Sequence, residues 1–305
     1  MAEKLPSYGG QAVIEGVMMR GTQAVAIAMR TPERDIKIHT EPLKGIYRSR
    51  VSKIPFLRGL TALWDALGLG VRALTISANT QTGEDEKLEG PALYLTLAIS
   101  LSFGIGLFFL APALVGQLSE RFLGFSAWWG NVLEGFIRLG LLVAYIYLIG
   151  LMPDIRRVFA YHGAEHKTIN AFEDGAELTP ENVATYSLEH PRCGTAFLLT
   201  LVLLSIFVFS LLGPLPMFWR LASRVILLPV LAMAAYEYIR WSANHLDNAF
   251  VRWITRPNLA LQRLTTREPS LEILEVSIAA FKAMLAEEVR VERPVEQLQE
   301  QRLTL

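Results

Sequence analysis

A single cysteine, Cys193, stands in a chain of 305 residues, so no disulfide can form within it. One free thiol suits a reducing compartment. The formal net charge is zero, which gives no electrostatic reason to expect a nucleic-acid partner. The first ten residues, MAEKLPSYGG, lack the apolar core of a signal peptide. We therefore expect the protein to enter a membrane through internal segments.

Charged residues make up only 19% of the chain and apolar residues 52%, and the mean hydropathy is +0.33. Four apolar segments are long enough to cross a hydrocarbon core of about 30 Å. They are residues 91–118, 132–152, 195–215 and 218–238. Tryptophans stand at their edges, as in the aromatic belts of membrane proteins. The sequence predicts a mainly α membrane protein with four transmembrane helices in residues 91–240.

Residues 1–53 are predicted to form a small β-rich cytoplasmic segment. QAVAIAMR and DIKIHTE alternate apolar and polar positions, and TPER separates them as a turn. The stretch GGQAVIEGVMMRG comes before them and reads as a turn followed by a half-buried strand. Glu15 and Arg20 are its candidate polar contacts.

Residues 54–90 are predicted to form an interfacial amphipathic helix and a linker. Arg58, Asp65 and Arg72 recur at seven-residue intervals in an otherwise apolar run, which places them on one stripe of a helix. Such a helix suits the membrane interface. Packing against the bundle as a buried or re-entrant helix is the alternative.

Residues 241–305 are predicted to be a cytoplasmic C-terminal region. An amphipathic helix over 270–285 follows Pro269 and is expected to dock on the cytoplasmic part, and a disordered tail begins near Val289. Lys and Arg are frequent in the first 90 residues and in the loop 153–194. The positive-inside rule then places both termini and this loop in the cytoplasm.

The loop 153–194 carries the candidate site. His162, Glu165 and His166 form an H-x-x-E-H array, and on a helix these positions share one face. This is the order of the inverted zinc proteases, in which the histidines bind the metal and the glutamate is the general base. His190 and Cys193 follow in a turn, and both side chains are ligands that zinc prefers.

Two kinds of zinc site remain open. In the first, His162, His166 and either His190 or Cys193 bind the metal, and Glu165 is the catalytic base. In the second, the three histidines and Cys193 form a closed structural site. Glu237 is a further candidate ligand or supporting group, or else it pairs with Arg240.

Charged residues inside the predicted membrane segments need partners. We expect Glu134 to pair with Arg224 or with Arg138 at i+4. The alternative is that these side chains extend to the outer headgroups.

Three stretches together resemble the YqhQ-like family of bacterial membrane proteins. They are GGQAVIEGVMMRG, then YHGAEHK with HPRCGTAFL, then LQRLTTREPSLEILEV. The family is catalogued as a domain of unknown function and is sometimes labelled metal-dependent. The resemblance implies a multi-pass inner-membrane protein without an established substrate.

Two classes of function follow. The first is a membrane-bound zinc hydrolase acting at the cytoplasmic face on a peptide, a lipid headgroup or an amide. The second is a non-enzymatic assembly or translocation factor with a structural metal site and a membrane-protein partner. A transporter is a third. In each case membrane lipids surround the protein.

Overall fold

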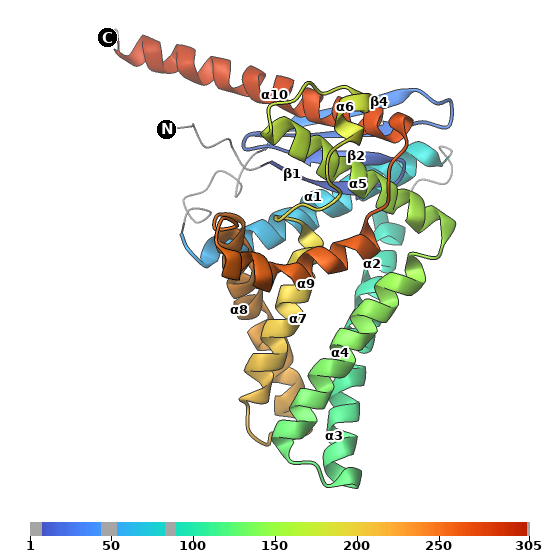
Figure 1. The fold of residues 1–305 in the computed structure, drawn as a ribbon, viewed down its shortest axis with the longest axis vertical. Coiled ribbons are helices and arrows are strands. Elements are labelled where there is room, and N and C mark those ends of the chain that lie inside the picture. The colour runs from blue at the N-terminus through green and yellow to red at the C-terminus, as the bar shows by residue number, and fades with distance from the viewer. Residues whose placement is uncertain (1–7, 44–53, 83–89, 304–305) are drawn as a thin grey trace.

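The computed structural model describes residues 8–43, 54–82 and 90–303. For Asp65 and residues 292–303 it describes the backbone only. Most of the predicted linker after α1 lies outside the described residues. Figure 1 shows a small sheet with helices above it, and long helices that extend away below it.

The elements follow in chain order. The strands are β1 (Gly9–Val13), β2 (Gly16–Arg20), β3 (Ala24–Arg30) and β4 (Ile36–Pro42). The helices are α1 (Leu57–Gln81), α2 (Gly90–Ile105), the π-helix η4 (Gly106–Leu110), α3 (Ala111–Leu123), α4 (Ala127–Ile149), α5 (Pro153–Glu173), α6 (Pro180–Ala184), α7 (Gly194–Ser210), α8 (Met217–Ala243), α9 (Ala249–Thr265) and α10 (Leu271–Leu303).

The four strands form an antiparallel sheet in the order β1-β2-β3-β4. The predicted hairpin of QAVAIAMR and DIKIHTE is confirmed as β3 and β4, with Ala24 opposite Pro42. GGQAVIEGVMMRG forms two strands, where the sequence indicated one. Glu15 lies in the tight turn between them with φ of 53°. Its carboxylate accepts hydrogen bonds from Arg157 (2.6 Å) and the Tyr161 hydroxyl (3.3 Å), which tie the turn to α5.

Both faces of the sheet are covered, because successive side chains of a strand point to opposite faces. One face packs under α5 and α10 and the other packs on α1 (Figure 1). The first cluster includes Val17, Met19, Ala26, Ala28, Ala164, Leu274 and Phe281, and the second includes Met18, Val25, Ile27, Leu69 and Ala73. The expected docking of the C-terminal amphipathic helix is therefore confirmed.

Helix α10 also holds the turn between β2 and β3. The buried Glu288 carboxylate accepts hydrogen bonds from the Gln23 backbone N–H (2.8 Å) and the Thr22 hydroxyl (2.9 Å). The helix continues to Leu303, where the sequence predicted a disordered tail.

Helix α1 lies between the sheet and the bundle. Leu69 and Ala73 in its second half are buried against the sheet. In its first half, the Arg58 guanidinium binds the Glu237 carboxylate of α8, with Nε 2.6 Å from Oε1. Arg72 pairs with Glu41 at 2.9 Å, and the side chain of Asp65 lies outside the description. The first half of helix α1 therefore packs on α8 and the second half on the sheet, while Trp64 and Leu67 are exposed.

The bundle consists of the α2–α3 run, α4, α7 and α8, which match the four predicted segments (Figure 1). In the described part of the chain, four helices are long and apolar enough to cross a membrane: α1, Gly90–Leu123, α4 and α8. Helix α7 is apolar but has only 17 residues. Large apolar side chains face outward on the bundle, among them Leu95, Ile99, Phe103, Phe207, Val225 and Ile226. This exposed apolar surface is typical of a membrane protein.

The predicted pairing of Glu134 is confirmed, and it is more extensive than expected. Its carboxylate accepts hydrogen bonds from Arg224 (2.7 and 2.9 Å) and from Arg138 (2.8 Å). The Arg138 Nε also donates to the Phe108 carbonyl in η4 at 2.9 Å. The wider turns of a π-helix shift backbone carbonyls out of the regular α-helical hydrogen-bond pattern. The Arg138 guanidinium supplies a hydrogen-bond donor to one such carbonyl, that of Phe108.

Helix α9 was not predicted. It lies across the upper ends of the bundle helices and contacts α7 and α4 (Figure 1). Val251, Leu261 and other residues of one face are buried, while Phe250 and Trp253 are exposed. The helix is therefore amphipathic.

Candidate metal centre

Helix α5 presents the H-x-x-E-H array. Pro153 at its first turn has a backbone angle suited to a helix start, and Asp154 complements the partial positive charge at that end. The helical prediction for this stretch is thus confirmed. The rings of His162 and His166 lie with centroids 4.4 Å apart.

Each of these two histidines is held by a backbone carbonyl. The Nδ1 of His162 lies 2.9 Å from the Thr265 carbonyl, and the Nδ1 of His166 lies 2.6 Å from the Leu188 carbonyl. Because a carbonyl only accepts, each Nδ1 must carry the proton. Each Nε2 is left with a free lone pair, as in histidines that bind metals.

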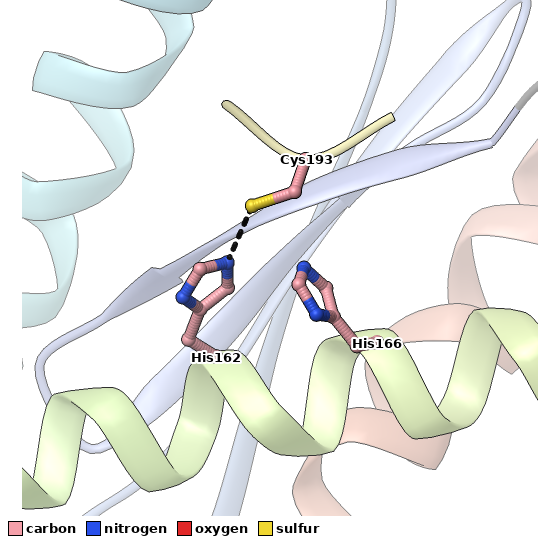
Figure 2. A group of neighbouring side chains, drawn as sticks. All are labelled: His162, His166 and Cys193. Carbon is pink, nitrogen blue, oxygen red and sulfur yellow. Dashed lines mark hydrogen bonds between the residues drawn. The ribbon is translucent and has the colours of Figure 1, made fainter. Parts of the chain in front are cut away.

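Cys193 faces both rings (Figure 2). Its Sγ lies 3.3 Å from the Nε2 of His162 and accepts a hydrogen bond from the Thr195 N–H at the start of α7. The ligand atoms of His162, His166 and Cys193 all lie within 4.8 Å of one another. Around one tetrahedral zinc, such atoms are roughly 3.5 Å apart. The donor types therefore suit zinc, and the spacing is wider than a bound ion would require.

His190 lies next to this group. Its ring centroid is 5.5 Å from that of His166, and its Nε2 is buried with no hydrogen-bond partner in the described structure. Burial lowers the pKa of His190 well below its ordinary value, and Arg192 and the neighbouring histidines lower it further. The imidazole is therefore neutral. The Gln262 side chain holds its backbone by accepting from the His190 N–H (3.0 Å) and donating to its carbonyl (2.9 Å).

Glu165 is buried between α5 and β1. It accepts a hydrogen bond from the Gly10 backbone N–H, and burial raises the pKa of Glu165 to about 7. A Cβ at Gly10 would lie 2.9 Å from the Glu165 Cγ, so the approach of β1 requires a glycine there. Glu165 does not belong to the group of three converging ligand atoms.

Residues 266–270, the strap between α9 and α10, pass over Gly163 to reach the site. A Cβ at this position would collide with the Arg267 carbonyl, and the Arg267 N–H donates to the Phe159 carbonyl at 2.9 Å. The glycine inside the H-x-x-E-H array therefore lets the strap bring the Thr265 carbonyl to His162.

Helix α5 also holds the loop that carries Cys193. The Lys167 Nζ donates to the carbonyls of Ala184 (2.7 Å) and Tyr186 (2.8 Å). The Asn170 amide donates to the carbonyls of Ser187 (2.9 Å) and Glu189 (3.1 Å). These bonds fix residues 184–189 along helix α5. The chain then continues to Cys193, which lies next to the two histidines.

A cavity of about 480 Å³ adjoins the site between α1, α8 and the start of α7. Cys193 lies in its wall together with Arg192 and Gly194. Glu165 does not line it. One wall of the cavity is therefore formed by a candidate metal ligand.

The two expectations for Glu237 were wrong. Its carboxylate binds Arg58 and accepts from the Phe56 backbone N–H at 3.0 Å, so it neither joins the metal ligands nor pairs with Arg240. The sequence could not show this, because the partner lies on a helix that packs back from far along the chain.

The groups that position the ligands were not predicted from the sequence. They are the carbonyls of Thr265 and Leu188 and the side chain of Gln262. A carbonyl has no sequence signature, but two of these residues belong to the stretch LQRLTT at the start of the third quoted motif. The three motifs thus meet at one place.

Comparisons with known proteins agree with this resemblance. A family model described as "Protein of unknown function (DUF1385)" matches residues 54–287. The chain is 36% identical over 296 residues to "Uncharacterized protein YqhQ" of Bacillus subtilis (strain 168), and the match covers 92% of each chain. No solved structure matches.

Proposed function

This chain belongs to the DUF1385 family of proteins of unknown function, and for it we propose a membrane-bound, metal-dependent hydrolase that acts at the cytoplasmic face of the bacterial inner membrane. The single observation that carries the proposal is the preorientation of the ligands. Two imidazoles are fixed through Nδ1, with each Nε2 directed toward one buried thiol. Such second contacts orient metal ligands in known sites.

In this proposal the Nε2 atoms of His162 and His166 and the Sγ of Cys193 hold zinc. Nitrogen and sulfur donors favour zinc over magnesium or calcium. Three protein ligands leave one position open, which is typical of catalytic zinc sites. The cavity beside Cys193 supports the same reading, because it would give a substrate access to one of the three ligands.

A zinc ion at this place would supply an activated water molecule for hydrolysis. The protein's part is to hold the ligands, admit the substrate and accept a proton. We assign the last role to Glu165, which is one residue from His166 on the same helix. The Gly10 N–H fixes its carboxylate. The burial of this carboxylate keeps bulk water away from it.

The membrane placement is part of the proposal. The basic residues before α2 and in the loop 153–194 favour a cytoplasmic sheet and α5. Helix α1 would then lie in the interface, because its buried half covers the sheet rather than other membrane helices.

Metal analysis of the purified full-length protein tests the proposal. We expect about one zinc per chain in the wild type and little in the double variant His162→Ala, His166→Ala. His39→Ala is the matched control, since His39 is exposed on β4. Unchanged metal content in the double variant would rule out the site. In a deletion strain, Glu165→Gln should retain metal but fail to restore function.

A structural metal site in an assembly factor is the second candidate. The unpartnered Nε2 of His190 favours it, because this atom could supply a fourth ligand and close the coordination sphere. X-ray absorption at the zinc edge separates the two. One sulfur and three imidazoles would indicate the structural site, and one sulfur, two imidazoles and an oxygen the catalytic one. Full complementation by Glu165→Gln would also end the hydrolase proposal.

A further inference from the structure

The cavity beside Cys193 has walls of two kinds. Apolar side chains come from α1, α7 and α8, and polar ones stand among them. The apolar group includes Ala62, Leu63, Ala66, Phe197, Ile239 and Ala243. The polar group includes Arg192, Tyr236, Arg240 and Asn244. At about 480 Å³ the cavity is large enough for part of an amphipathic molecule.

Arg240 gives the cavity a cationic group that has no direct partner among the described residues. Its guanidinium makes no ion pair or hydrogen bond there. Glu237, the nearest carboxylate along the helix, interacts with it electrostatically but is bound to Arg58. Arg192 pairs with Glu173, but its Nε is buried without a hydrogen-bond partner there. Both arginines can therefore take an anionic ligand.

The cavity stands at the level where a membrane interface would meet the protein. The outward face of α1 is apolar, with Trp64 67% and Leu67 58% exposed. Trp241 on α8 is also exposed, close in sequence to Arg240. Tryptophan and arginine side chains together are typical of the headgroup region. A lipid is therefore the amphipathic molecule with direct access.

We propose that this cavity binds a membrane lipid with an anionic headgroup, and that such lipids are the substrate class of the metal site. The assignment of substrate rests on the proposed hydrolase function. An acyl chain packs along Leu63, Phe197 and Ile239. The phosphate binds Arg240. Because Cys193 forms part of the wall and directly follows Arg192, the polar end of the lipid lies beside Cys193, one of the three candidate metal ligands.

Lipid binding by the full-length protein tests the inference. The probe is palmitoyl-oleoyl phosphatidylglycerol, titrated into delipidated protein in detergent and followed by native mass spectrometry. Phosphatidylcholine with the same acyl chains and inorganic phosphate are the comparison ligands. We expect one phosphatidylglycerol per chain, about tenfold weaker binding of phosphatidylcholine, and no saturable binding of phosphate.

Two variants address the two kinds of wall. Ala62→Phe fills the apolar part, and Arg240→Gln removes the cation. Each should weaken phosphatidylglycerol binding about tenfold. The matched controls are Leu67→Phe, on the exposed face of α1, and Arg256→Gln, exposed on α9, and both should bind as the wild type does. The thermal unfolding midpoint of every sample serves as the check on folding, and its zinc content is measured in parallel.

The outcomes separate the two proposals. The lipid inference is overturned if phosphatidylglycerol binds no better than phosphatidylcholine, or if both cavity variants bind it with unchanged affinity. If the protein retains zinc in that case, the hydrolase proposal still stands. Selective lipid binding by a wild type that holds no zinc overturns the hydrolase and the substrate assignment together. Selective binding, sensitive to both variants, in a zinc-loaded protein supports both.

Discussion

Glu134 on α4 and Arg224 on α8 form a two-point ion pair, 2.7 and 2.9 Å long, in which both side chains are 1% exposed. Arg138 and Arg220 approach the same carboxylate at 2.8 and 3.4 Å. One carboxylate therefore holds together the guanidinium groups of two helices.

Glu134→Gln should destabilise the bundle. Removing one partner of a buried ion pair leaves uncompensated charge, which costs about 3–5 kcal/mol in soluble proteins. We expect a clearly lower unfolding midpoint in detergent by thermal denaturation. Glu120→Gln is the control, because Glu120 pairs with Arg220 but is partly exposed. This variant should lower the unfolding midpoint by less than Glu134→Gln does. Equal midpoints for wild type and Glu134→Gln would contradict the prediction.

Gly163→Ala should lower metal content. The added Cβ would collide with the Arg267 carbonyl and push the α9–α10 strap, with the Thr265 carbonyl, away from His162. Loss of a contact that orients a ligand typically costs 10- to 100-fold in metal affinity. Competition with a chelator measures it. Gly140→Ala is the control, since a Cβ there meets nothing within 4 Å.

Gln262→Leu should destabilise the loop that carries the site. Gln262 is fully buried and holds both backbone groups of His190, so an apolar replacement leaves the His190 N–H without its partner and leaves the His190 carbonyl with the Cys193 N–H alone, at 3.3 Å. We expect a loss of about 2 kcal/mol and faster amide exchange at His190. Exchange rates equal to those of the wild type would show that another group holds the loop.

Metal-depleted protein should show a pH effect that depends on Glu165. Its pKa is about 7 when folded against an ordinary 4.5, so the folded state binds the proton more tightly. Relative to Glu165→Gln, the wild type should have its full stability below pH 4.5 and lose about 3 kcal/mol as the pH rises through 7. Chemical denaturation of both proteins across this range measures the difference. A constant difference would contradict the raised pKa.

Much of this fold follows from local patterns. The alternation of apolar and polar residues predicts β3 and β4, and the length of the apolar runs predicts the bundle helices. The helical spacing of apolar residues after Pro269 predicts that α10 docks on the rest of the protein. The proximity of His162, His166 and Cys193 was predicted from their helical spacing and scarcity, and their binding of metal stays a prediction. The anchors from Thr265 and Leu188 were not predictable, because a carbonyl looks the same in every residue. The pairing of Glu237 with Arg58 also depends on how distant helices pack.

The position of α10 has a consequence for the order of synthesis. The sheet is made first, but one of its faces is completed by the last helix of the chain, whose Glu288 holds the turn at Thr22 and Gln23. Because the ribosome delivers α10 after every apolar helix of the described chain, one face of the sheet stays partly uncovered until those helices have been synthesised. A chain that stops before residue 271 would carry all of its apolar helices and every candidate metal ligand, yet it would leave the face of the sheet that α10 covers partly exposed.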